Sequence, residues 1–260
     1  MTDLQTPDIQ LAHRFLGARG PRDELLHVAI TGSHIYGFSS RDSDIDMKGI
    51  HIVPTAQLLG LSPSTPPFDR LEVFEGMECD LTTHEVAHAI GMLLKGNGNV
   101  LERIGSPYQL RTNAAFEALL PLAQASVHQG FYKHYAGYFR GMQREHRLRR
   151  RAKTALYAFR VALTGHHLLR TGRLVTDVRI LGDEHELPVV RELVQFKAAH
   201  NEKASIPSSL YRAAEDCWPQ LEALLQSALD GSHLPSEPPN RSEFERWLLD
   251  VRRAHWDASA

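Results

Sequence analysis

Two aspartates separated by one residue have the type and spacing most suited to chemistry. Asp44 and Asp46 flank Ile45 at the start of the apolar run Ile45–Val53, which is predicted to be a strand. Side chains alternate along a strand, so both carboxylates are expected on one face while Ile45 faces the core. Carboxylates held this close repel each other and are tolerated mainly beside a divalent cation. Their oxygens suit Mg²⁺ or Mn²⁺ bound together with substrate phosphates.

Gly32 and Ser33 end the preceding apolar run, Leu25–Thr31, which is also predicted to be a strand. A glycine lets the backbone approach a ligand closely, and exposed N–H groups with the Ser33 hydroxyl could hold the terminal phosphates of a nucleoside triphosphate. Alone, a Gly-Ser pair is usually a turn and an Asp-x-Asp a solvated loop. Their order on consecutive strands favours the functional interpretation.

A third carboxylate is expected on a neighbouring strand, to complete the metal site and to accept the proton of an attacking hydroxyl. Asp80 is the best candidate, because Cys79 and Leu81 supply the apolar face of its strand. Glu78 has the same parity and is the alternative. Glu72 is interpreted as the solvent face of the same hairpin.

The elements that position these residues change character along the chain of 260 residues. The first part alternates strands and helices, and it includes a hairpin over residues 71–82 that turns at Glu75-Gly76. Helices are predicted over Pro7–Gly17, His84–Leu94, Asn113–Val127, Phe131–Leu169, Pro188–Lys203, Ser208–Leu229 and Ser242–Trp256, with a loop over Asp230–Asn240. We therefore predict an α+β protein, with a small mixed-sheet catalytic domain over residues 1–107 and an all-helical domain over residues 108–260.

The segment from Gly32 to Pro54 resembles the Gly-Ser…Asp-x-Asp signature of the DNA polymerase beta nucleotidyltransferase superfamily. It is more similar still to the RNA repair pathway DNA polymerase beta family, in which a basic residue, a glycine and an aliphatic residue follow the aspartates, as Lys48-Gly49-Ile50 do here. Residues 93–107 and 153–177 also resemble that family, so the likeness covers roughly residues 28–200. His34 departs from the wider superfamily, where many members carry Arg after the Gly-Ser pair. This departure concerns a charge contact to the triphosphate rather than the metal site.

The resemblance implies a metal-dependent, template-independent nucleotidyltransferase. It would move a nucleoside monophosphate from an NTP onto an RNA 3′ hydroxyl and release pyrophosphate, with two Mg²⁺ or Mn²⁺ ions held by Asp44, Asp46 and Asp80 as catalytic residues. Nucleotide contacts are expected from Gly32, Ser33, Lys48, Lys153, Tyr157 and Arg160. Ordinary surface charge is the alternative interpretation of Lys153 and Arg160. The alternatives are transfer onto a protein hydroxyl, as in antitoxin-like enzymes, transfer onto a small molecule, or a non-catalytic nucleotide- or RNA-binding module.

The charge of the chain is uneven. Residues 1–100 hold 7 Lys+Arg and 13 Asp+Glu, whereas the remainder holds 22 and 18. On one continuous helix, Arg140, Arg144, Arg147 and Arg151 would follow one face. Such a stripe suits the phosphate backbone of RNA, with tRNA or damaged 3′ ends as the expected partner. A solvated or acid-paired helix face is the alternative.

Other motifs carry less weight. His84-Glu85-Val86-Ala87-His88 matches the HExxH pattern of zinc proteases, but no third ligand is evident. Cys79 and Cys217 are too few for a disulfide framework. No secretory signal pattern and no apolar run of about 18 residues is found, so we expect a cytoplasmic protein without a membrane partner.

Overall fold

The computed structural model describes residues 6–41, 43–59, 61, 65–201 and 203–257. Contacts divide the chain into two compact units. The sheet unit comprises Pro7–Gly32, Asp44–Ser126 and the segment from Pro238 onward, and the helical unit comprises Ser33–Ser43 and Val127–Glu237. The predicted α+β class is confirmed by a mixed five-stranded sheet and many helices. The domain boundary placed after residue 107 stays a prediction.

The sheet has the strand order β3-β4-β2-β1-β5. Its strands are β1 (Glu24–Ile30), β2 (Ile45–Ile52), β3 (Phe68–Phe74), β4 (Met77–Glu85) and β5 (Gln109–Thr112). β2 and β4 run parallel, whereas the other three neighbouring pairs are antiparallel. The expected hairpin is confirmed, and its turn residues Glu75 and Gly76 both have positive φ, at 50° and 86°. Positive φ at both turn positions matches the right-handed twist of the flanking strands.

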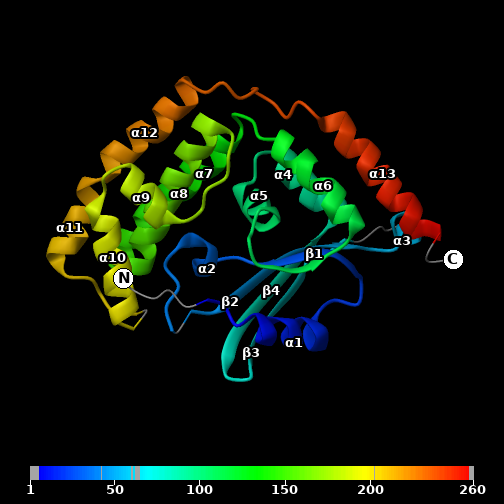
Figure 1. Ribbon diagram of the computed structural model, residues 1–260, viewed down its shortest axis with the longest axis horizontal. Coiled ribbons are helices and arrows are strands. Elements are labelled where there is room, and N and C mark those ends of the chain that lie inside the picture. The colour runs from blue at the N-terminus through cyan, green and yellow to red at the C-terminus, as the bar shows by residue number, and fades with distance from the viewer. Residues whose placement is uncertain (1–5, 42, 60, 62–64, 202, 258–260) are drawn as a thin grey trace. The chain divides into compact units, whose positions relative to one another are not determined.

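One face of the sheet is closed by α1 (Ile9–Arg19), which begins at its N-cap Asp8. Leu11, Ala12 and Phe15 of this helix form one apolar core with residues of β1, β2 and β4, including Ile45, Met47, Cys79 and Leu81. Every second residue of β2 and β4 therefore points into this core, as the alternating pattern predicts. Figure 1 shows α1 on one side of the sheet and α4, α5 and α6 on the other.

The other helices of the sheet unit are α3 (Thr55–Leu58), α4 (Val86–Leu94), α5 (Gly98–Ile104), α6 (Ala114–Ala125) and α13 (Arg241–Asp257). The last of these packs against α3, α4 and α6. Arg252 of α13 forms an ion pair with Glu85 at 2.5 Å, with side chains 11% and 2% exposed. Trp247 donates its indole N–H to the Ala115 carbonyl at 3.0 Å. The end of the chain is therefore part of the sheet unit.

The helical unit is built around α8 (Ala152–Thr171), most of whose side chains are buried. It contacts α7, α9, α10 and α12. The remaining helices of this unit are α2 (Ser33–Tyr36), α7 (Phe131–Arg149), α9 (Val178–Glu184), α10 (Pro188–Ala199), α11 (Ser208–Asp216) and α12 (Trp218–Asp230). No helix of the described residues is long and apolar enough to cross a membrane.

The continuous helix predicted over Phe131–Leu169 is wrong, because the chain breaks it at Arg150. This residue takes the left-handed conformation, with φ 51° and ψ 42°, and its N–H bonds the His146 carbonyl. The Arg150 carbonyl then accepts from the Ile206 N–H at 2.9 Å. A non-glycine residue in this region costs local energy, and the local bond to His146 and the tertiary bond from Ile206 stabilise it.

Two smaller differences concern segments near chain breakers. The predicted helix Ser208–Leu229 is interrupted at Cys217, and Pro219 lies in the first turn of α12. Strand β5 follows the boundary predicted after residue 107, in the part expected to be all-helical, and lies at the edge of the sheet beside β1.

Candidate active site

Two aspartates of neighbouring strands, Asp46 and Asp80, lie side by side on the half-exposed face of the sheet, and we call them the acidic row. Asp46 of β2 and Asp80 of β4 are register partners on neighbouring parallel strands. Their neighbours Ile45, Met47 and Leu81 are buried on the α1 side, so both carboxylates point to the opposite side. Asp44 comes directly before β2, has the same parity as Asp46 and is half-buried. The faces predicted for Asp46 and Asp80 are thus the faces in the structure, whereas the face of Asp44, outside the strand, stays a prediction.

Lys48 lies on the same face, two residues beyond Asp46. Its Nζ donates to Asp80 Oδ2 at 2.7 Å and to Thr82 Oγ1 at 3.0 Å. Lys48 and Thr82 are register partners, so the next rung of the sheet carries the cation. The lysine therefore offsets part of the negative charge that the row concentrates, and it fixes the orientation of the Asp80 carboxylate.

Gly32 is required beside this row. Its φ is 66°, and a Cβ added there would lie 2.0 Å from Asp46 Oδ2. The preceding Thr31 donates its N–H to the Asp46 carbonyl at 2.8 Å. The sequence suggested a close approach of this glycine to a ligand, whereas the structure shows a close approach to the Asp46 carboxylate. Any larger residue would displace that carboxylate.

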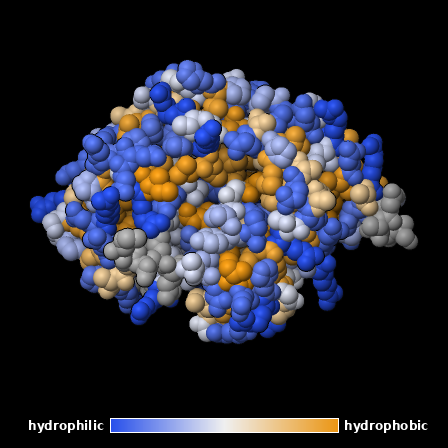
Figure 2. All heavy atoms as spheres, in the orientation of Figure 1, coloured by the Kyte–Doolittle hydropathy of each residue, from blue (hydrophilic) through white to orange (hydrophobic). Residues whose placement is uncertain are grey.

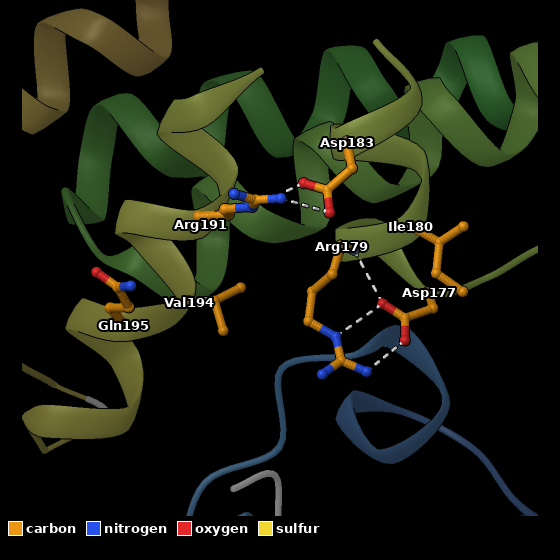
Figure 3. A pocket seen from close by; sticks show the side chains of 7 residues that line it. All are labelled: Asp177, Arg179, Ile180, Asp183, Arg191, Val194 and Gln195. Atoms are coloured by element: carbon orange, nitrogen blue, oxygen red, sulfur yellow. Dashed lines mark hydrogen bonds and ion pairs between the residues drawn. The ribbon is translucent and has the colours of Figure 1, made fainter. Parts of the chain in front are cut away.

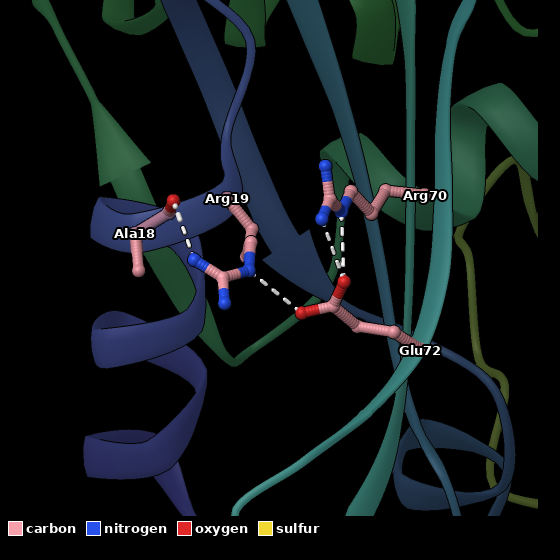
Figure 4. Close-up of polar contacts among 4 residues, drawn as sticks. All are labelled: Ala18, Arg19, Arg70 and Glu72. Atoms are coloured by element: carbon pink, nitrogen blue, oxygen red, sulfur yellow. Dashed lines mark hydrogen bonds and ion pairs between the residues drawn. The ribbon is translucent and has the colours of Figure 1, made fainter.

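The two other acids of the hairpin differ in position. Glu78 has the parity of Asp80 but is exposed, near the turn. Glu72 lies on the α1 side, where it accepts from Arg19 Nε at 2.7 Å and from Arg70 Nη2 at 2.7 Å (Figure 4). Hydrogen bonds from Arg70 and then Arg19 lower the pKa of Glu72 below its usual value. Its role is therefore to tie α1 to β3 rather than to face the acidic row.

The donor set of the acidic row fits a hard divalent ion, although the row is not a complete cage. Among the residues that the structure describes, no three His, Cys, Asp or Glu side chains lie close enough to form a metal cluster. Asp46 and Asp80 still offer carboxylate oxygens from adjacent strands, and Mg²⁺ typically takes only one or two protein carboxylates plus substrate phosphates. Cys79 is not a competing ligand, because burial raises its pKa to about 11.

The HExxH pattern does not lie on one helix, as a zinc-protease motif requires. His84 and Glu85 end β4, and only His88 lies in α4, so the two histidines do not share a helix. Glu85 instead accepts from the Ala87 N–H at 2.8 Å and pairs with Arg252. Burial, followed by the charge of Arg103, lowers the pKa of His84 to about 4. Glu85 is therefore the N-cap of α4 and holds α13 through its ion pair with Arg252.

Ser33 opens the segment Ser33–Ser43 of the helical unit. It is 3% exposed, and no described residue bonds its Oγ. The guanidinium of Arg160 lies over the Tyr36 ring at 3.9 Å, and the Tyr157 ring contacts Tyr36 edge-on at 5.7 Å. Two residues predicted to contact the nucleotide, Tyr157 and Arg160, are therefore packed against the turn that Ser33 begins. The buried Ser33 hydroxyl suits a phosphate oxygen.

Three further residues contact this segment, and the sequence did not indicate these contacts. Thr176 donates its hydroxyl to the Ile35 carbonyl at 2.8 Å. Asp177 caps α9, and a Cβ on Gly37, at φ 81°, would lie 2.0 Å from its Oδ1. Lys197, 4% exposed, donates to Ser40 Oγ at 2.6 Å. A lysine on the buried stripe of α10, at helical spacing from Val190 and Val194, was the available signal.

A cavity of about 430 Å³ lies beside Asp177, between α9 and α10 (Figure 3). Its charges are arranged as two ion pairs, Arg179 with Asp177 at 2.6 Å and Arg191 with Asp183 at 2.8 Å. Each arginine already faces a carboxylate, so this cavity offers little net charge to a ligand. Asp177 and Arg179 also lie beside Gly37, so the cavity borders the Ser33–Ser43 segment.

The predicted arginine stripe is only partly formed. Arg140, Arg144 and Arg147 follow one face of α7, but Arg151 is the N-cap of α8 because α7 ends at Arg149. Arg147 also pairs with Glu215 at 3.1 Å. A continuous four-residue stripe is therefore wrong.

Comparison with known proteins identifies the family. The model of the RNA repair pathway DNA polymerase beta family matches residues 9–250. The chain belongs to this family. Its members are nucleotidyltransferases, so this chain is a nucleotidyltransferase, and the family links it to an RNA repair pathway.

Other comparisons add less. A nucleotidyltransferase-like protein from Exiguobacterium sibiricum 255-15, known from a crystal structure, aligns with 95% of this chain and 80% of its own, at 14% identity and a TM-score of 0.36. No curated protein matches the chain significantly. Within this RNA repair pathway family member, Asp46, Asp80, Lys48 and Gly32 come together in the sheet unit, whereas Ser33, Tyr157 and Arg160 come together in the helical unit. Lys153 lies on the first turn of α8.

Proposed function

We propose that this family member transfers a nucleoside monophosphate from an NTP to the 3′ hydroxyl of an RNA, with release of pyrophosphate. The observation that carries the proposal is the pairing of Asp46 with Asp80 on adjacent parallel strands, beside a glycine that leaves room for the Asp46 carboxylate. Phosphoryl transfer needs little covalent help from the protein and much positioning and charge neutralisation. Paired carboxylates supply the means for both.

Asp44, Asp46 and Asp80 would hold two Mg²⁺ or Mn²⁺ ions. When bound, such ions neutralise the charge of the triphosphate and favour the ionised form of the attacking hydroxyl.

The chain's own residues have separate roles in this proposal. Asp80 accepts the proton of the 3′ hydroxyl as the new phosphate ester forms, because it lies at the edge of the row away from Gly32. Lys48 orients Asp80 through the bond at 2.7 Å. The Ser33 hydroxyl and the Gly32 backbone bind the phosphates that leave as pyrophosphate. Of the other predicted nucleotide contacts, Arg160 is buried against Tyr36 and supports the turn that Ser33 begins. Lys153 and Tyr157 line a cavity of the helical unit and are assigned to the acceptor below.

The experiment incubates the full chain with Mg²⁺, each α-labelled NTP and either bulk tRNA or no acceptor, and it resolves the products by size. Label is expected on RNA, and it should be lost in Asp44→Asn and Asp46→Asn. Asp216→Asn, an exposed carboxylate of α11, is the matched control and should transfer normally. Label on the protein alone, label on an added aminoglycoside, or NTP binding without turnover would each contradict the proposal.

A further inference from the structure

A second cavity of the helical unit lies between α7 and the start of α8. Its volume is about 420 Å³. One helix contributes residues at the spacing i, i+4, i+7 and i+11, and the other contributes residues of its first two turns. We call this cavity the α7–α8 pocket; α7 supplies Tyr138, Met142, Glu145 and Arg149, and α8 with its N-cap supplies Arg151, Lys153, Thr154 and Tyr157.

Each of the two helices contributes one tyrosine to the lining of the pocket. Tyr138 is 43% exposed, and its ring stacks on His134 at 4.8 Å. The Tyr157 ring is fixed edge-on by Tyr36 at 5.7 Å and by Phe38 at 5.3 Å. Rings held in this way offer a stacking surface to a nucleobase at little cost in side-chain entropy. The volume is in the range of small-molecule sites, about 300–1,000 Å³.

The charge of the pocket is positive. Three cationic residues and one acid line it. Glu145 accepts from Arg149 Nε at 2.5 Å, and the ionisable side chains of the lining together carry more positive than negative charge. A nucleobase is neutral and needs no such charge, whereas a nucleotide unit of a nucleic acid carries one phosphate with its base.

The break at Arg150 separates this pocket from the predicted stripe. Two residues along an α-helix correspond to about 200°, so the face of Tyr138 and Met142 is nearly opposite to the face of Arg140 and Arg144. Because α7 ends at Arg149, Arg151 lines the pocket instead of extending the stripe. The end of α7 at Arg149 therefore places the Arg151 cation in the lining of the pocket and not on the face of Arg140 and Arg144.

From these observations we infer that the α7–α8 pocket binds one nucleotide unit of the acceptor RNA, with its base against Tyr138 and Tyr157 and its phosphate at Arg151 and Lys153. The inference rests on the proposed function, under which the triphosphate of the NTP is bound at Gly32 and Ser33. The phosphate left for the pocket is then that of the acceptor strand.

The test measures binding of a short fluorescent single-stranded RNA by anisotropy, in EDTA and without NTP, so that no turnover contributes. The double variant Arg151→Gln/Lys153→Gln is expected to bind at least about tenfold more weakly and to lower the magnitude of the salt slope by about 0.7, the value for one phosphate of a single strand that is no longer neutralised. Tyr138→Ala removes an exposed ring without a charge change and should weaken binding about fivefold to a hundredfold. Circular dichroism confirms that each variant is folded.

Two further double variants provide the comparison. Arg212→Gln/Arg246→Gln removes two exposed cations that lie outside the lining of the α7–α8 pocket and should change RNA affinity less than twofold. Arg140→Gln/Arg144→Gln tests the opposite face of α7 and should cost less affinity than the pocket pair. An equal or greater loss from the Arg140 and Arg144 pair would overturn the inference.

The outcomes separate this inference from the proposed function. If the pocket variants weaken binding of a labelled NTP and leave RNA binding intact, the pocket belongs to the nucleotide and the inference fails. If the unaltered chain binds no RNA, it fails as well. If the pocket variants weaken RNA binding but the unaltered chain transfers no label to RNA, the inference stands and the proposed function fails.

Discussion

The two units place charged residues in opposite ways. In the sheet unit, Asp46 and Asp80 lie on a half-exposed face, and the strand register alone makes them neighbours. In the helical unit, Arg160 and Lys197 are 2% and 4% exposed and hold a loop from two different helices. Backbone register positions a carboxylate within a short motif, whereas long buried side chains position a loop from sites far away in the sequence.

The largest expected effect is on the rate of nucleotidyl transfer, and it tests whether Asp80, the register partner of Asp46, is the third carboxylate. Asp80→Asn should lower nucleotidyl transfer about 10²- to 10⁴-fold, because it removes the proposed proton acceptor while preserving shape. Glu78→Gln should stay within a few fold of the unaltered chain, since Glu78 is exposed near the turn. Single-turnover transfer to RNA measures both.

Glu72→Gln is the matched control for the opposite face of the hairpin, and we expect lower thermal stability without loss of the chemical step. A large loss in Glu78→Gln together with an active Asp80→Asn would reverse the assignment of the third carboxylate.

The next effect concerns the closure of the sheet unit by the end of the chain. Glu85→Gln leaves the charge of Arg252 buried without its carboxylate, and breaking such a pair costs about 3–5 kcal/mol of unfolding free energy. Urea denaturation measures this loss. Asp250→Asn removes an exposed pair of the same helix, at 74% side-chain exposure, and should change stability by less than about 0.5 kcal/mol. Equal effects of the two variants would show that α13 is not anchored by Glu85.

The smallest effect is the response to acid. His27 is buried and stacked on Phe116 at 4.1 Å, and burial lowers its pKa to about 3. Between pH 6.5 and about 3 the unfolded chain binds a proton that the folded chain does not, so stability falls as the pH falls through this window. Between pH 7 and pH 5, the free energy of unfolding of His27→Phe should therefore fall by about 2 kcal/mol less than that of the unaltered chain.

His166 makes the corresponding contribution in the helical unit, because burial and then the charge of His185 lower its pKa to about 4. His233→Gln, at an exposed position, serves as the control and should leave the acid response unchanged. Denaturant midpoints measured at both pH values decide the question; equal acid sensitivity of His27→Phe and the unaltered chain would contradict the assignment.

The sequence was most informative where local rules decide the structure. Alternation along Ile45–Ile52 and Met77–Glu85 predicted the faces of Asp46 and Asp80, and Glu75-Gly76 predicted the hairpin turn. Their roles in catalysis stay predictions.

The features that could not be predicted from the sequence depend on contacts between residues far apart in the chain. Nothing in the local pattern marks Arg150 as a helix end, because its left-handed conformation depends on a bond from Ile206. The same holds for the contact of Arg252 with Glu85, which joins residues far apart in the chain. Lys197 offered a signal, a charge at a core position of α10, but its partners Ser40 and Ser43 are not identifiable from spacing.

The chain leaves the sheet unit after Gly32 and returns to it at Asp44, so the family signature straddles both units. Cutting the gene anywhere between the sheet and α7 would strip Ser33–Ser43 of the contacts supplied by Thr176 and Lys197. A recombination event that transfers only the segment from Gly32 to Pro54 would therefore leave Ser33–Ser43 without these contacts. Protein engineers who wish to graft this motif onto another scaffold must transplant α8, α9 and α10 along with the strands, and natural exchange of the helical unit is constrained in the same way.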